Sequence, residues 1–378
     1  MTVSRRAFVR GLGGGALLVP FAAGRGLEAR MGPEPVAGRR SRAGDLLRLD
    51  SNENPNGPSP QALEAIRDTL DEACRYPGDL ERRLEERLAA HHRVGADQIV
   101  LGCGSTELLR VAVDAFASRG RWVVTAAPSF ETPATYAAAR GIPVVAVPVA
   151  TDLGLDLDAM VGRSIGAGLV YLCNPNNPTG TVHSKSDVES FVDRVLAKAP
   201  AAQILIDEAY FEYVDRPGHD SMIPRALDDP RVFVLRTFSK VHGMAGLRVG
   251  YGIGRPETIG ALAKYRLRLG VNVLGAAAAL AAVGDERRVG AERAKNREAR
   301  EYTAAFFERA GLSCASSATN FLMVDIGRPI ETFRAACASA GVAVGRPFPP
   351  LTTHARISIG TLAEMRHATG VFGRILGV

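Results

Sequence analysis

Seven short runs of apolar, mostly β-branched residues recur along the chain. They span residues 98–101, 122–126, 144–149, 169–173, 203–207, 232–236 and 249–254. Most are almost continuously apolar, which is typical of strands buried on both faces of a mainly parallel sheet. Segments with helical spacing, such as 107–117 and 187–198, separate many of them. Strands that alternate with helices predict a layered α/β domain.

The pattern changes after residue 276. An Ala-rich, charged helical stretch runs to residue 310, and short strand-like, helix-like and strand-like segments follow. This block predicts a smaller α+β domain. We therefore expect a large domain over 76–275 and a small C-terminal domain over 276–378. An N-terminal arm over 45–75 is expected to join the small domain.

The first residues have the features of an export signal. Two arginines at positions 5 and 6 precede an apolar, Gly-rich stretch at 11–24. This arrangement resembles a twin-arginine signal. It predicts a signal peptide over 1–30, a disordered spacer over 31–44, and export to a periplasmic or other extracytoplasmic compartment. An Arg-rich tail on a cytosolic enzyme is the alternative.

The charge of the chain lies in this leader. Of the 46 basic and 40 acidic residues, eight Arg and two Glu fall within residues 1–44, so the leader accounts for the net charge of +6. The balanced body gives no support for nucleic-acid binding. Outside the first thirty residues no apolar run reaches a membrane-spanning length, so membrane contact is expected only through an uncleaved signal. The five cysteines form no CxxC pair, which argues against a disulfide framework or a metal site.

Lysine is rare in this chain, which makes one lysine conspicuous. Only five of the basic residues are Lys, and four of these lie in polar, helix-like surroundings. Lys240 instead follows the apolar run 232–236 and precedes Arg248 by eight residues. Burial disfavours the ammonium form, so such an amine is ready to attack a carbonyl carbon. A nearby guanidinium lowers its pKa further and can bind an anion through two hydrogen bonds.

Polar residues also follow other predicted strands. Asp207 closes the run 203–207, and a buried carboxylate needs a cationic or hydrogen-bonding partner. A protonated pyridine nitrogen is one such partner, in which case Tyr210 can donate to a ring hydroxyl. An Asp that caps the following helix is the alternative. Gly104, Ser105 and Thr106 open a helix, where they form either a phosphate site or an ordinary N-cap.

A proline-rich loop and one phenylalanine do not indicate a function by themselves. Residues 174–180 form a loop punctuated by prolines, which by composition is a turn. Phe130 can stack on a planar cofactor or pack as a core aromatic.

In this order and spacing the motifs resemble the fold-type I pyridoxal-phosphate aminotransferases, specifically the class-II group that includes histidinol-phosphate aminotransferase. The resemblance covers the chain from residue 49 onward. It is carried by Asn52-Glu53-Asn54-Pro55, Tyr76-Pro77, Gly104-Ser105-Thr106, Asn-Pro-Asn-Asn-Pro-Thr-Gly at 174–180, Asp207-Glu208-Ala209-Tyr210, Ser239-Lys240 with Arg248, and Arg356-Ile357-Ser358-Ile359-Gly360. It implies a three-layer fold, pyridoxal 5'-phosphate as cofactor, and amino transfer from an L-amino acid to a 2-oxo acid.

Carried over by position, the resemblance implies a role for each residue. Lys240 bonds to the cofactor and later moves the α-proton, and Asp207 keeps the pyridine nitrogen protonated. Arg356 binds the substrate's α-carboxylate, and Arg346 matches an arginine that binds a distal phosphate. The other cofactor contacts are Tyr210 and Asn177 at the phenolic oxygen, Phe130 on the ring face, and Gly104, Ser105, Thr106, Ser239 and Arg248 at the phosphate. Tyr76 reaches the phosphate from a second subunit, which implies a homodimer.

Two positions depart from the pattern of histidinol-phosphate enzymes. That group usually has tyrosines where this chain has Asn56 and Val271, and both help to enclose the imidazole of the substrate. Arg346 also precedes Arg356 by only ten residues, a shorter separation than the group shows. The amino donor implied by the resemblance is an L-amino acid, either histidinol-phosphate-like or aromatic, and these departures weaken the case for the imidazole substrate. A lyase or decarboxylase on the same fold is the alternative function, and a non-catalytic binding module is a third hypothesis.

Overall fold

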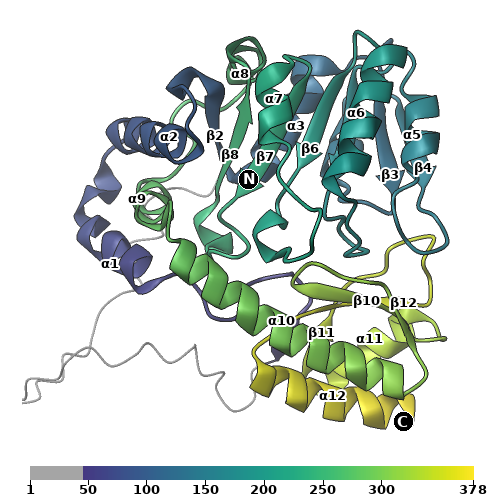
Figure 1. Cartoon of the computed structure of the whole chain (residues 1–378). Helices are drawn as coiled ribbons and strands as arrows, with labels where there is room; N and C mark the ends of the chain where they lie inside the picture. The colour runs from purple at the N-terminus through teal and green to yellow at the C-terminus, as the bar shows by residue number, and fades with distance from the viewer. Residues whose placement is uncertain (1–45) are drawn as a thin grey trace, which may run out of the picture. The chain divides into compact units, whose positions relative to one another are not determined.

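The computed structural model describes residues 46–378, and the predicted signal peptide and spacer lie outside the described residues. Its centre is a seven-stranded sheet in the order β2-β8-β7-β6-β5-β3-β4 (Figure 1). The strands are β2 (Ile99–Cys103), β3 (Val123–Ala127), β4 (Val144–Pro148), β5 (Leu169–Cys173), β6 (Gln203–Asp207), β7 (Val232–Thr237) and β8 (Val249–Gly254). Every run expected from the sequence is one of these strands.

The sheet is mainly parallel, as predicted. Strands β3 to β7 pair in parallel with their neighbours, and β8 runs antiparallel to both β2 and β7. The carboxyl ends of β5, β6 and β7 therefore meet at one edge. In open α/β sheets this edge is where ligands bind.

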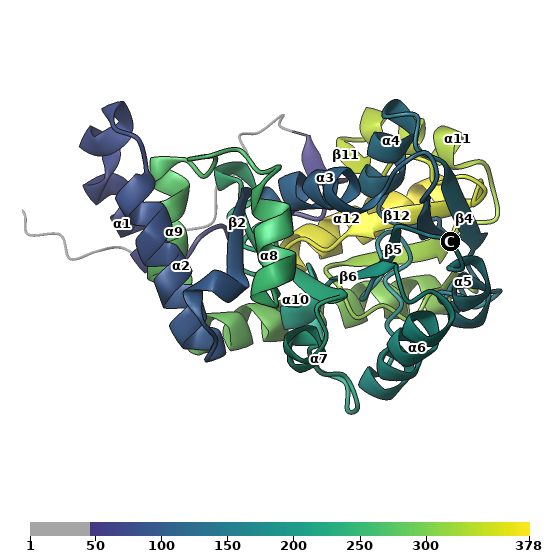
Figure 2. The ribbon, with the colours of Figure 1, turned by 90° about the horizontal axis from the view of Figure 1, so that it is seen from above.

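Helices cover both faces of the sheet, because alternate residues of its strands are buried on opposite sides. In β5, Leu169, Tyr171 and Cys173 pack with α3, α4 and α8, whereas Val170 and Leu172 pack with α5, α6 and α7. Figure 2 shows α3 and α4 on one side of the strands and α5, α6 and α7 on the other. These helices are α3 (Gly104–Phe116), α4 (Thr132–Ala139), α5 (Leu157–Arg163), α6 (Lys185–Lys198), α7 (Ile223–Asp228) and α8 (Pro256–Ala263).

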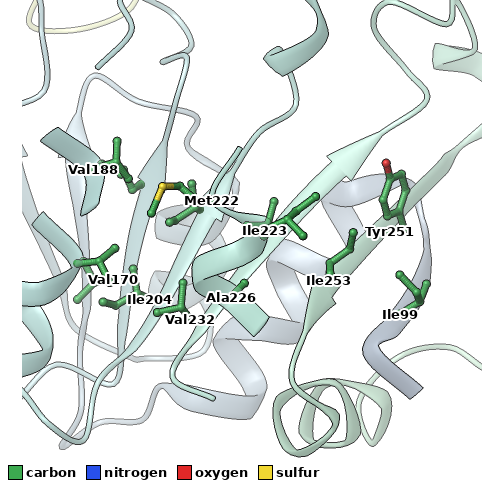
Figure 3. Close-up of a cluster of buried hydrophobic side chains, with 14 of the residues drawn as sticks. Ile99, Val170, Val188, Ile204, Met222, Ile223, Ala226, Val232, Tyr251 and Ile253 are labelled. Atoms are coloured by element: carbon green, nitrogen blue, oxygen red, sulfur yellow. The ribbon is translucent and has the colours of Figure 1, made fainter. Parts of the chain in front are cut away.

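Branched aliphatic side chains form most of the core on the second of these faces. Figure 3 shows Val170, Ile204 and Val232 from successive strands in the same apolar cluster as Ile223 of α7. Three more helices pack at the β2 side: α1 (Pro60–Asp68), α2 (Gly78–His92) and α9 (Val273–Ala282). Helix α9 lies between α1 and α2 (Figure 1).

The remaining elements build two small sheets. Strands β9 (Ser313–Cys314), β10 (Phe321–Asp325) and β12 (His354–Ser358) pair antiparallel, with β10 in the middle. Strand β1 (Leu47–Leu49), from the N-terminal arm, pairs in parallel with β11 (Val342–Val344). The helices around them are α10 (Glu286–Arg309), α11 (Ile330–Ser339) and α12 (Leu362–Leu376), and they enclose a separate apolar core.

Short single-turn helices complete the described chain: η1 (Leu70–Cys74), η2 (Ala96–Gln98), η3 (Phe211–Tyr213) and η4 (Ala245–Leu247). Between residues 46 and 378, no helix combines the length and the apolar character needed to span a membrane.

Candidate functional site

A pocket of about 500 Å³ lies where the carboxyl edge of the large sheet faces the small sheets and the N-terminal arm. Eleven of the residues singled out in the sequence line it. They are Ser105, Thr106, Phe130, Asn177, Asp207, Tyr210, Ser239, Lys240, Arg248, Arg346 and Arg356. Segments more than 250 residues apart in the chain thus contribute to one cavity.

Asp207 lies at the end of β6 and is only 2% exposed. Its Oδ2 accepts a hydrogen bond from the Tyr171 hydroxyl at 2.9 Å, and its Oδ1 accepts one from the Ala209 amide at 3.1 Å. Burial raises the pKa of Asp207 to about 6, against the opposing effect of these two donors and of the Lys240 charge. The carboxylate is therefore ionised at neutral pH.

Lys240 follows β7 and enters the same cavity. Its Nζ donates to the Asn52 carbonyl oxygen at 3.1 Å. Burial, together with the positive charges of Arg356 and Arg248, lowers the pKa of Lys240 to about 8. An amine with such a pKa is substantially uncharged at mildly alkaline pH, which is the form that attacks carbonyl carbons.

Helix α3 and Arg248 form a cradle for an anion. The Arg248 guanidinium donates to Ser239 Oγ at 3.2 Å and to Thr106 Oγ1 at 3.5 Å. It lies so close to Gly104 (φ +69°) that a Cβ there would come within 2.1 Å of Nη2. A guanidinium, three hydroxyls and the first amides of a helix are a donor set that suits a phosphate dianion.

Glycine at position 250 lets this cradle pack against the sheet. A Cβ at Gly250 would lie 2.2 Å from the amide nitrogen of Ser105, so no larger residue fits without moving the start of α3. The close approach of strand β8 to the cradle explains why this strand position carries no side chain.

Arg356 lies on β12 at the opposite wall. Its Nη1 donates to Asn177 Oδ1 at 2.8 Å and its Nη2 donates to the Asp50 carbonyl oxygen at 2.7 Å. Its Nε is buried and finds no hydrogen-bond partner among residues 46–378. A buried donor without a partner is costly, so this guanidinium is suited to bind an anion such as a carboxylate.

Asn52 joins the arm to the rest of the site, and the sequence motif gave no role for it. Its backbone is left-handed (φ 53°), a conformation that asparagine tolerates better than most residues. Its side chain donates to the Tyr210 hydroxyl at 3.1 Å and accepts from Ser358 Oγ at 2.9 Å. With its carbonyl bonded to Lys240, Asn52 connects the arm, the small sheets and the reactive amine.

A buried ion-pair cluster braces the strand ends behind the pocket. Arg236 of β7 pairs with Glu208 at 2.7 Å and with Glu212 at 3.0 Å, and its guanidinium lies 3.8 Å from the ring centre of Phe211. Glu208 directly follows Asp207 in the chain. The cluster therefore fixes the ends of β6 and β7, from which Asp207 and Lys240 extend.

Several predicted residues lie elsewhere or have other partners. Tyr76 is 87% exposed and does not line the pocket. Arg346 reaches the pocket mouth, where it forms an ion pair with Glu131. Asn56 donates to Glu292 Oε2 at 2.7 Å, and Val271 is buried in the core beside α9, so neither contributes to the pocket wall of its own chain.

Comparison with known proteins gives a consistent result. A family model described as aminotransferase class I and II matches residues 44–372. The chain is 41% identical to a histidinol-phosphate aminotransferase of Symbiobacterium thermophilum, covering 88% of this chain and 91% of that protein. It is 38% identical to an aromatic amino acid aminotransferase of Rhodococcus jostii, covering 84% and 87%.

A solved structure agrees with these relatives. Histidinol-phosphate aminotransferase from Sinorhizobium meliloti, crystallised with pyridoxal-5'-phosphate, superimposes with a TM-score of 0.81 at 31% identity. The match covers 88% of this chain and 91% of that one.

The pKa of Lys240 leads to a test of the site. After removal of bound small molecules, acetylation of Lys240 by acetic anhydride should reach half its maximal rate near pH 8, because only the uncharged amine reacts. Lys185 is the matched control, since its hydrogen bond to Asp220 raises its pKa above 10.5. Mass spectrometry of the peptides measures both rates. Equal pH profiles for the two lysines would refute the pKa shift.

Proposed function

Because the chain belongs to the aminotransferase class I and II family, and is a pyridoxal-phosphate-dependent transaminase, we propose that the pocket around Lys240 and Asp207 is its active site. The observation that carries this proposal is their arrangement. A lysine with a lowered pKa and a buried carboxylate line one cavity, together with the anion cradle at Arg248. The site is thus built to hold a phosphorylated aromatic aldehyde.

The residues of the pocket fit pyridoxal phosphate. The glycine-lined cradle of Ser105, Thr106, Ser239 and Arg248 suits its phosphate, and the buried carboxylate of Asp207 suits a protonated ring nitrogen. Phe130, Asn177 and Tyr210 line the space between these two ends. When bound, the cofactor supplies a ring that accepts electrons from the bond being broken.

The chain's own residues then have distinct tasks. Asp207 holds a proton on the ring nitrogen, because a buried carboxylate without a positive partner is strongly disfavoured. Lys240 Nζ would take the proton from the donor's α-carbon and would later protonate the α-carbon of the acceptor as it becomes an amino acid, which a pKa near 8 permits. Tyr210 and Asn177 hold the ring hydroxyl oxygen. Arg356 binds the α-carboxylate through donors that include the unpartnered Nε.

We further propose that the amino donor carries an aromatic or anionic side chain. The relatives named for histidinol phosphate and for aromatic amino acids support these two classes. The pocket mouth offers the ring of Phe130 and the guanidinium of Arg346. Arg346 is already paired with Glu131, so an anionic donor has to displace that carboxylate.

The enzyme is proposed to act as a homodimer in which Tyr76 completes the phosphate site of the second subunit. The support is the exposure of this residue and of other large apolar side chains. Tyr76 is 87% exposed, and Leu70, Tyr265 and Leu267 are also exposed large apolar side chains. The loop that carries Tyr265 and Leu267 is held to α2 by an ion pair between Arg266 and Glu81 at 2.9 Å. Large apolar side chains that are exposed in a single chain are buried when they form part of an interface.

We also propose that the N-terminal leader directs export of the enzyme. The arginine pair at positions 5 and 6 and the apolar stretch at 11–24 support a twin-arginine signal over residues 1–30. That route carries folded proteins, which suits an enzyme that acquires its cofactor before transport.

Removing the amine tests the assignment of the site. Lys240→Ala should abolish amino transfer while retaining much of the phosphate-mediated affinity for pyridoxal phosphate, because the cradle is untouched. Steady-state assays with amino donors and 2-oxo acids measure the first effect, and cofactor titration measures the second. Lys264→Ala, which alters a lysine outside the pocket, is the control. Near-wild-type turnover of Lys240→Ala would contradict the assignment.

A second prediction concerns the pocket mouth. Glu131→Gln should lower KM for donors with a distal phosphate or carboxylate by up to about fivefold, since an exposed ion pair is worth about 1 kcal/mol or less. KM for neutral aromatic donors should stay unchanged. Glu257→Gln, which breaks an exposed pair with Arg255 outside the pocket, is the matched control. An equal change for both donor classes would rule out this role for Glu131.

Mixing two defective variants tests the shared site. Tyr76→Ala should bind cofactor weakly and Lys240→Ala should be inactive, yet hybrid dimers of the two contain one intact site. Random exchange of subunits should restore about a quarter of wild-type activity at limiting cofactor. If activity stays at the level of unmixed Tyr76→Ala, Tyr76 does not act across an interface.

A further inference from the structure

Tyr171 is a buried tyrosine in the middle of strand β5, and only 1% of it is exposed. Its hydroxyl donates to Asp207 Oδ2 at 2.9 Å. On β5 the residue that pairs directly with Asp207 is Cys173, which lies two positions after Tyr171 on the same face of the strand. Tyr171 therefore reaches Asp207 from below the cavity and does not itself line the pocket.

Apart from Asp207 and the Cys173 thiol, the other side chains around Tyr171 are apolar. Its neighbours in the core are side chains such as Leu109, Leu205 and Phe233. A hydroxyl in such a place is costly unless it is bonded, and among residues 46–378 its recorded hydrogen bond is to Asp207. Burial, and then the negative charge of Asp207, raise the pKa of Tyr171 well above 10, so the hydroxyl keeps its proton and stays a donor.

The other groups that face Asp207 cannot replace this donor. Lys240 acts on it through charge from the loop after β7, and Glu208 adds a like charge from the next position. The Cys173 thiol donates to the Pro175 carbonyl oxygen instead, and burial raises its pKa far above the usual range. Within the described residues, Tyr171 is the side chain that donates a hydrogen bond to Asp207.

We propose that Tyr171 is a positioning residue, which orients the Asp207 carboxylate from beneath and keeps it ionised for the ring nitrogen of the cofactor. One oxygen is fixed by the hydroxyl and the other by the Ala209 amide, so the plane of the carboxylate is set by two bonds from different elements. This inference rests on the proposed role of Asp207.

The test compares four variants of the full chain by pyridoxal-phosphate titration across pH. Tyr171→Phe should raise the dissociation constant about tenfold at neutral pH, because a hydrogen bond to a charged group is lost. The pH at which affinity reaches its plateau should also rise. Asp207 ionises with a pKa of about 6, and removal of a donor to its charged form raises that pKa.

Tyr251→Phe is the matched control. Tyr251 is a buried tyrosine of β8 in the same sheet, and its hydroxyl bonds to His92 Nε2 at 3.1 Å, away from the pocket. Lys240 and the ionisable groups of pyridoxal phosphate titrate in the wild type and in both tyrosine variants. A change in the plateau pH that occurs in Tyr171→Phe but not in Tyr251→Phe therefore reports on Asp207. Asp207→Asn serves as the reference for complete loss of the carboxylate.

A second substitution at position 171 should change the plateau pH in the opposite direction. It keeps the proposal testable if Tyr171→Phe misfolds. Difluorotyrosine incorporated at position 171 is a stronger donor of nearly the same shape, so it should move the affinity plateau to lower pH. Both displacements, in opposite directions, support the proposal.

The outcomes separate the inference from the function on which it rests. If Tyr171→Phe matches Tyr251→Phe in affinity and plateau, or loses affinity without moving the plateau, Tyr171 has no positioning role. A plateau unmoved by difluorotyrosine overturns the proposal equally. If Asp207→Asn binds the cofactor as tightly as the wild type, the proposed role of Asp207 itself fails.

Discussion

The buried charge of Asp207 is the constraint on which the other features of the site depend. A carboxylate removed from water is destabilised by several kcal/mol unless donors and an opposite charge compensate it. Here Tyr171 and the Ala209 amide supply donors, and Lys240 supplies the charge. Burial acts on the two ionisable partners in opposite senses, since it brings the pKa of Asp207 up to about 6 and that of Lys240 down to about 8. Between these values both are charged, and above pH 8 the amine becomes the uncharged nucleophile.

The site also needs both halves of the described chain. The large sheet provides Asp207, Lys240 and the anion cradle, whereas Arg356 comes from β12 of the small sheets. Asn52 holds the two together, because its carbonyl accepts from Lys240 and from Asn320 Nδ2 while its side chain bonds Tyr210 and Ser358. The pairing of β1 with β11 fixes the arm that carries Asn52. The reactive amine is thereby tied to elements from three regions of the sequence.

The strands of the large sheet were predictable because apolar β-branched runs buried on both faces have few other uses, and every such run is a strand. The short strands β1, β9 and β11 were not, since two or three residues give no periodicity. Most residues that line the pocket were also predictable, because they directly follow a predicted strand or belong to a motif of the family. Tyr171 sits inside an apolar strand, where its hydroxyl gives no local signal, and the pairing of Glu131 with Arg346 joins positions 215 residues apart. Asn52 lies in a recognised motif, yet its function depends on a tertiary hydrogen-bond network.

The proposed function requires that one particular amine, that of Lys240, faces the buried carboxylate and carries the cofactor. Borohydride reduction of the holoenzyme, followed by peptide mass spectrometry, tests it directly, because reduction fixes the pyridoxyl group to the lysine that held it. The chain has only five lysines, at positions 185, 198, 240, 264 and 295, so the result is unambiguous. We expect stoichiometric labelling of Lys240. Labelling of any of the other four, with Lys240 unmodified, would contradict it.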